Sequence, residues 1–217
     1  MTKILEVYQK YQNTPVLQEH QLRVAAVAWQ ICDHFDLPID KKAIIDACLV
    51  HDIGNILKFV ADAPAEWFAP QGVDYWMSVK KQMAEQYQTT DEHELSLKIA
   101  KELGMSALVL DCIESIDFNK TVEVISRPQF EPRICDYADL RADPNGIVSM
   151  DQRLEEGNKR YKNRPDKWLT DDVRAKILDA CYVNEREIFA HCGSLKPQDI
   201  TDQTSAPIIA KLRSYEI

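Results

Sequence analysis

The stretch LRVAAVAWQIC, residues 22–32, is the feature that most limits how this chain can fold. Thr14 and Pro15 form a strong helix start ahead of it, because threonine is a good N-cap and proline fits the first helical position. The helix is predicted to extend to about Phe35, and it is apolar around most of its circumference. Such a helix is stable only when other helices cover it. The sequence therefore predicts an all-α helical bundle.

Helical patterns also fill most of the remaining chain. Asp40 is predicted to cap a second helix that Gly54 interrupts, followed by a short helical turn. Residues 61–72 contain two prolines and a glycine and are predicted to form a loop. Capping-box spacing at Thr89 and Glu92 predicts another helix that ends near Gly104. Further helices are expected over residues 73–87, 106–116, from Pro132 to a stop at Pro144-Asn145-Gly146, over 149–161, and from about 170 to 192.

The 217 residues suit a single domain over residues 1–217, with a motif-containing core at about 14–145 and a C-terminal helical extension at about 146–217. The net charge of −9 argues against a general binder of nucleic acid or anionic membranes, since those partners need a basic face. No segment has the length of a membrane span or the pattern of a secretory signal. The six cysteines are scattered in apolar helical patterns, as in a reduced cytoplasm, and we expect a cytoplasmic protein.

The polar pair His51-Asp52 ends an apolar helical run, although both side chains need water or a partner. One interpretation is structural, with Asp52 capping the next turn and His51 satisfied in the core. His20 and Asp139 favour a second interpretation, because each lies on the inward face of another apolar helix. Two histidines and two aspartates on three inward faces suit one divalent cation bound by nitrogen and oxygen ligands, such as Fe, Mn, Co, Ni, Zn or Mg.

The order His20, His51-Asp52, Asp139 resembles that of the HD-domain superfamily of metal-dependent phosphohydrolases. HDIG at residues 51–54 is similar to the doublet of one large subset, and ICDYADLR around Asp139 resembles the segment of the last ligand. The resemblance covers roughly residues 14–145. It implies an HD-type helical bundle and His20, His51, Asp52 and Asp139 as metal ligands. Alanine precedes the family's last ligand, which favours Asp139 over Asp136, and Asp136 is then left to solvent or to a second layer around the metal.

Two cations near these ligands are candidate substrate contacts. Arg23 lies one helical turn after His20 and could bind a phosphate group bidentately. Lys58 lies seven residues after His51. Asn55 is a third candidate, and it stands where some family members have an acidic residue in HDxxE. Because Asn55 replaces that acidic residue, another residue must transfer the proton, and Asp52 is one candidate.

His93 lies in a segment similar to one in which related proteins place a further histidine. We predict that His93 lies at the edge of a mononuclear site, where it contacts phosphate or serves as a catalytic residue in addition to Asp52. A second metal bridged by Asp117 is the alternative, although the chain has no histidine in that stretch.

The resemblance implies an enzyme that hydrolyses a small phosphate ester, with a nucleotide as the favoured substrate class, by attack of metal-bound hydroxide on phosphorus. Two alternatives stay open. One is a non-catalytic HD module that senses a nucleotide or phosphate, and the other is a di-iron oxygenase of the HD type. The expected partner is a small phosphorylated molecule, and the sequence leaves a homodimer open.

Overall fold

The computed structural model describes residues 2–143, 145–161 and 170–217, and its helices confirm the predicted all-α class. No β-strand occurs in these three ranges. The α-helices are α1 (Ile4–Lys10), α2 (Pro15–His34), α3 (Lys41–Val50), α4 (Val73–Tyr87), α5 (Glu92–Glu102), α6 (Ala107–Ser115), α7 (Thr121–Ile125), α8 (Phe130–Asp139), α9 (Met150–Tyr161), α10 (Asp171–Ala190) and α11 (Asp202–Leu212). Short 3₁₀ helices are η1 (Asn55–Lys58), η2 (Ala65–Phe68), η3 (Phe118–Lys120) and η4 (Pro197–Asp199).

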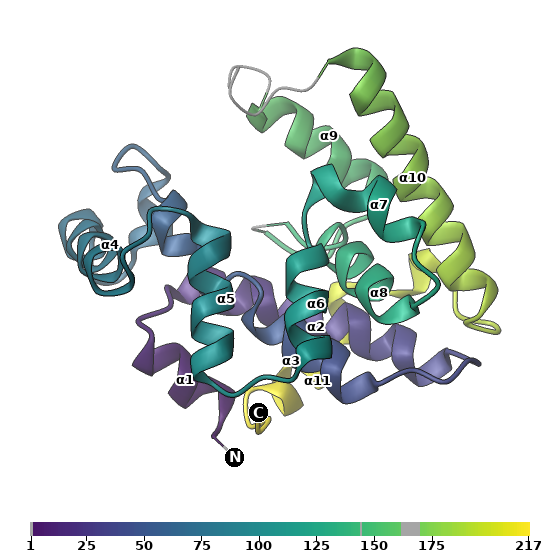
Figure 1. The fold of residues 1–217 in the computed structure, drawn as a ribbon, viewed down its shortest axis with the longest axis horizontal. Coiled ribbons are helices and arrows are strands. Elements are labelled where there is room, and N and C mark those ends of the chain that lie inside the picture. Colours follow the sequence, from purple (N-terminus) through teal and green to yellow (C-terminus); the bar gives the residue numbers. More distant parts are fainter. Residues whose placement is uncertain (1, 144, 162–169) are drawn as a thin grey trace.

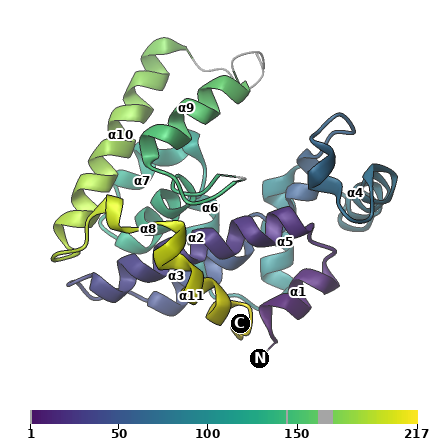
Figure 2. The ribbon, with the colours of Figure 1, turned by 180° about the vertical axis from the view of Figure 1, so that it is seen from behind.

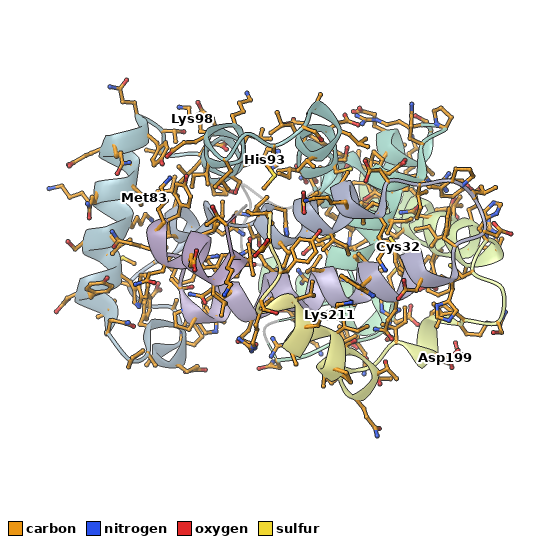
Figure 3. The ribbon with its side chains drawn as sticks, turned by 90° about the horizontal axis from the view of Figure 1, so that it is seen from below. Cys32, Met83, His93, Lys98, Asp199 and Lys211 are labelled. Atoms are coloured by element: carbon orange, nitrogen blue, oxygen red, sulfur yellow. The ribbon has the colours of Figure 1, made fainter. Side chains whose placement is uncertain are left out.

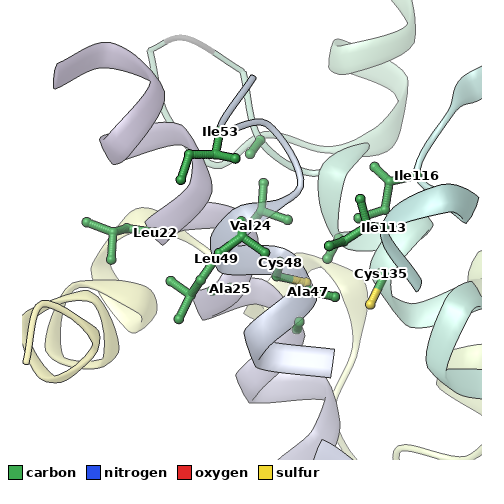
Figure 4. Packing of buried hydrophobic residues seen from close by; sticks show 14 of the residues in the cluster. Leu22, Val24, Ala25, Ala47, Cys48, Leu49, Ile53, Ile113, Ile116 and Cys135 are labelled. Carbon is green, nitrogen blue, oxygen red and sulfur yellow. The ribbon is translucent and has the colours of Figure 1, made fainter. Parts of the chain in front are cut away.

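Helices α2 and α3 form the centre of the bundle. Thr14 caps α2 through its side-chain oxygen, Pro15 follows it, and Asp40 caps α3 in the same way, as predicted. Leu22, Val24 and Ile31 of α2 are fully buried. Each large aliphatic side chain buried in this way stabilises the fold by about 1.5–3 kcal/mol. Figure 4 shows α2 and α3 residues packed together with Ile113, Ile116 and Cys135 from neighbouring segments.

The other helices surround this centre unevenly. Helix α8 packs on α2, α3 and α6, while α10 packs on α7 and α8 (Figure 1). Helix α4 lies at the opposite edge, against η1 and η2. Seen from behind, α11 crosses α2 close to the paired ends of the described chain (Figure 2). There the Ile4 amide donates to the Tyr215 carbonyl at 2.9 Å.

Three predicted boundaries are wrong. Asp91, not Thr89, caps α5, and the Thr89 hydroxyl instead donates to the Glu94 carboxylate. The predicted loop at 61–72 contains η2. Helix α8 begins at Phe130 and ends at Asp139, well before the predicted stop at Pro144-Asn145-Gly146. Pro144 itself lies outside the described residues. This early end leaves Asp139 at a helix terminus.

Among the described residues, no helix combines the length and the apolar character needed to cross a membrane. The six cysteines all lie in the described ranges and are free, five of them buried.

Candidate metal centre

His20 lies in the second turn of α2, where the cap at Thr14 fixes the start of the helix. Its side chain is 14% exposed, and Nε2 lies 3.0 Å from Asp139 Oδ1 and 3.5 Å from Asp52 Oδ2. The His20 ring centroid is 5.4 Å from that of His51. Mutual packing of α2, α3 and α8 therefore brings together three segments that are far apart in the sequence.

His51 is the C-cap of α3, and its side chain is only 3% exposed. Nδ1 lies 2.9 Å from the Cys48 carbonyl, so this nitrogen donates its proton to a backbone acceptor. Nε2 then faces the carboxylates, 3.4 Å from Asp139 Oδ1 and 3.7 Å from Asp52 Oδ1. It forms no hydrogen bond within the part of the chain that the structure describes. A buried imidazole nitrogen in this position is suited to a metal ion.

The turn after α3 positions Asp52. The Asn55 amide donates to the Asp52 carbonyl at 3.0 Å, so the chain continues into η1 without a break. The Gly54 amide donates to the Ser96 hydroxyl of α5 at 3.0 Å. A methyl group added at Gly54 would lie 2.3 Å from the Glu92 carbonyl oxygen and 2.7 Å from the Ser96 nitrogen. Glycine is therefore required here by the close approach of α5, and the turn is fixed against that helix.

The two carboxylates and the two imidazoles interact strongly. Burial lowers the pKa of His51, but the negative charges of Asp52 and Asp139 raise this pKa to about 9. Burial alone would raise the pKa of Asp139, yet its contacts with His20 and His51 hold that pKa well below the usual value. Without a cation, the carboxylates favour a proton on His51. A bound metal ion would take the place of that proton.

The donor atoms of His20, His51 and Asp52 all lie within 4.8 Å of one another and could hold a metal ion. Asp139 does not belong to this group of three, but it contacts both imidazoles. The structure thus brings the four predicted ligands together. Neutral imidazole and carboxylate donors, with an unpartnered buried nitrogen among them, fit a divalent cation.

The predicted substrate contacts lie on the elements that support this centre. Arg23 is half-buried on α2, one turn from His20, and Asn55 is buried at the start of η1. Lys58 at the end of η1 is exposed, and its Nζ lies 3.3 Å from Glu92 Oε1 of α5. Sequence reasoning missed Glu92 as the partner of Lys58, since the two residues are far apart in the chain.

His93 follows Glu92 on α5, and its Nε2 lies 3.2 Å from Glu114 Oε2 of α6. Figure 3 shows His93 on the same side of the molecule as Lys98 of α5. Glu114 also binds Lys120. The contact with Lys120, and to a smaller extent the contact with His93, lowers the pKa of Glu114. Glu114 was not predicted, because nothing in the local pattern marks it. His93 therefore belongs to an imidazole–carboxylate–ammonium group.

Asp117 and Asp136 lie in two different environments, an N-cap and a buried position beside α7. Asp117 Oδ1 accepts from the Asn119 amide and so caps η3. Asp136 is 2% exposed, which excludes the prediction that it faces solvent. Its Oδ1 lies 3.4 Å from the Thr121 hydroxyl, whereas Oδ2 has no partner among the residues described. Burial, followed by the charge of Asp139, raises the pKa of Asp136 well above its usual value.

This burial predicts a pH-dependent effect of Asp136→Asn. Because the folded-state pKa is raised, ionisation of Asp136 opposes folding, and stability is lost as pH rises above the unfolded-state pKa of about 4. In EDTA at pH 7 the neutral variant should gain about 1–3 kcal/mol in unfolding free energy. The gain should vanish below about pH 4. Urea unfolding at several pH values measures it, with the exposed Asp179→Asn as control. A variant less stable than wild type at pH 7 would contradict the prediction.

Residues 17–95 match the family model described as HD domain. The matched segment includes His20, His51 and Asp52 and ends before α8, which contributes Asp139. The match is to the HD domain as a whole, and membership of the HDIG subset stays a prediction from residues 51–54. Comparisons with curated proteins and with solved structures gave no significant match.

Proposed function

We propose that this chain, whose residues 17–95 match the HD-domain family model, is a metal-dependent phosphohydrolase acting on a small phosphate ester, with a nucleotide as the favoured substrate. The main support is the Nε2 atom of His51, which is buried and without a hydrogen bond in the described chain, and which faces Asp52 and Asp139. A divalent cation bound there would make water more acidic and neutralise charge on a phosphoryl oxygen.

The residues of the chain would have separate roles in metal binding and in substrate binding. His20, His51, Asp52 and Asp139 would hold the cation. Arg23 and Lys58 would contact the phosphate, with Asn55 as a neutral donor. Lys58 now pairs with Glu92 at 3.3 Å in an exposed position, and such a pair contributes less than about 1 kcal/mol, so a phosphate can replace the carboxylate.

Two groups could move the proton. Asp52 is 22% exposed and adjoins His20 and His51, and His93 is backed by the Glu114 carboxylate. In the second case, Glu114 would orient the imidazole of His93 and stabilise its charged form. We assign the transfer to Asp52 and His93, since Asn55 cannot supply it.

Metal analysis combined with phosphate release tests this function. The purified protein should contain about one metal ion per chain and release phosphate or a phosphomonoester from at least one member of a nucleotide panel with Mn²⁺, Co²⁺, Ni²⁺ or Mg²⁺. EDTA should abolish turnover, and added metal should restore it. Absence of metal after reconstitution would contradict the site, and two irons per chain would favour the oxygenase.

The second candidate is a regulatory HD module that binds a nucleotide or phosphate without turnover. Asn55 favours it, because this buried amide occupies the position at which some family members have an acidic residue. Saturable binding by the metal-loaded protein, with no product over the whole panel, would support this candidate over the enzyme.

A further inference from the structure

The Ser96 hydroxyl lies between α5 and the turn that carries Asp52. Ser96 is fully buried, and its Oγ donates to the Glu92 carbonyl at 3.1 Å, one helical turn back. The same oxygen accepts from the Gly54 amide at 3.0 Å. A hydroxyl has one proton to donate and two lone pairs with which to accept. Ser96 therefore uses both functions to join the α5 backbone to residues 51–54.

The contacts of the Asp52 carboxylate are too long to orient it by themselves. Its oxygens lie 3.5 Å from His20 Nε2 and 3.7 Å from His51 Nε2, beyond the usual hydrogen-bond lengths of about 2.7–3.2 Å. The direction of this side chain thus depends on the backbone of the turn. Gly54 follows two residues later, and there the backbone is bonded to another helix through Ser96.

Helix α5 is a firm support for this bond. Asp91 caps its start, and Leu95 and Ile99 are fully buried. The helix packs on α6 and on η1 (Figure 1). A methyl group added at Gly54 would lie 2.7 Å from the Ser96 nitrogen, so the two backbones are already in close contact. The hydroxyl therefore has little freedom to move away from the turn.

The same helix carries two groups that the proposed function places near the substrate. Glu92 pairs with Lys58 at 3.3 Å, and His93 pairs with Glu114 at 3.2 Å. Because Ser96 belongs to this helix, its bond to the turn also sets these groups relative to the metal ligands.

From these contacts we propose that Ser96 is a positioning residue of the metal centre, which holds Asp52 in place by bonding its turn to α5. The inference rests on the metal site of the proposed function and adds to it a residue outside the ligand set. Removal of the hydroxyl leaves the Gly54 amide buried without this acceptor, which is unfavourable. The turn then shifts, and Asp52 no longer faces His20 and Asp139 as it does in the wild type.

Titration with Co²⁺ tests the proposal without turnover, because the visible absorption of this ion reports its ligand geometry. Ser96→Ala should bind Co²⁺ about 10–100-fold more weakly than the wild type and with a changed spectrum, since residues that orient metal ligands have effects of this size. Ser96→Thr keeps the hydroxyl and should restore wild-type binding. Ser96→Val has the shape of the threonine variant without the hydroxyl, and it should bind as weakly as the alanine variant.

The Gly54 amide gives a second readout in EDTA, without metal. Its hydrogen exchange, followed by NMR, should be faster in Ser96→Ala than in the wild type, because the amide has lost its acceptor. Exchange at the same rate in both proteins would show that the hydroxyl does not hold the turn, and it would overturn the proposal.

Ser115→Ala is the matched control. Ser115 is also fully buried, donates to the Asp111 carbonyl four residues back at 2.7 Å, and accepts from Arg127 at 3.2 Å. This control should bind Co²⁺ as the wild type does. Equal Co²⁺ affinity in Ser96→Ala and wild type, or an equal loss in Ser115→Ala, would overturn the inference and leave the proposed function standing. A wild-type protein that binds no Co²⁺ would overturn both.

Discussion

His51→Ala should lose metal binding almost completely, with affinity reduced by more than about 100-fold, while the fold survives. The variant loses the Nε2 donor and the hydrogen bond from Nδ1 to the Cys48 carbonyl. A buried acceptor without its donor and a small cavity together cost about 1–3 kcal/mol, which a bundle of this size can tolerate. Phosphate release, if it depends on the metal, should disappear with it.

Two measurements separate loss of the metal from loss of the fold. Elemental analysis gives the metal content of each purified variant. Thermal unfolding with and without added metal gives a second readout, because a ligand that binds only the folded state raises Tm. Metal should raise the Tm of wild type and leave that of His51→Ala unchanged. This comparison does not require the substrate to be known.

His34→Ala is the matched control for this experiment. His34 lies at the last residue of α2, where it is exposed and its Nδ1 lies 2.9 Å from the Gln30 carbonyl. The control should keep the metal content and the metal-dependent rise in Tm of the wild type. A His51→Ala protein that retains stoichiometric metal would show that the imidazole is not a ligand.

The convergence of His20 and His51 could be anticipated because each lies in a segment with strong local signals. Thr14-Pro15 and Asp40 fix the starts of α2 and α3, so the inward faces that contain His20 and His51 follow from helical periodicity. The all-α class follows from the same apolar helix. Such features depend on neighbours in sequence, and a single sequence is enough to recognise them.

The end of α8 depends instead on contacts between distant segments. No breaker separates Asp139 from the predicted stop, yet the helix ends at Asp139. Arg141, which is 3% exposed, donates to the carbonyls of Val148, Pro197 and Ile200 and so holds the chain in another direction. Two of these acceptors, Pro197 and Ile200, come from a segment far along the chain. Local propensity therefore could not place the terminus that presents Asp139.

Helix α11 was missed for a related reason. It contains Pro207, which normally argues against a helix, and its sequence has little apolar periodicity. Its stability comes from packing on α2 and from the buried Ser205, whose hydroxyl accepts from Gln30 at 2.8 Å. These stabilising contacts join segments far apart in the chain, so local propensity could not predict this helix.

Gly54→Ala should destabilise the protein by about 3 kcal/mol, the upper part of the range for overpacking. The new methyl group would meet backbone atoms of α5 at 2.3 and 2.7 Å, and backbone cannot move aside as the end of a flexible side chain can. Either α5 or the turn at 51–54 must shift. A shift of the turn moves Asp52 relative to His20, so metal affinity should fall as well. Chemical denaturation in EDTA measures the first effect, and metal titration of the folded variant measures the second.

Gly157→Ala provides the contrast that isolates close packing from the general effect of replacing glycine. Gly157 lies within α9, and no described atom comes within 4 Å of a methyl group added there. Alanine is favoured over glycine in a helix by about 1 kcal/mol, so this variant should be as stable as wild type or more stable. If Gly54→Ala were equally harmless, α5 would not be packed against the HDIG turn as the structure shows. Asp52 would then depend on some other contact for its position.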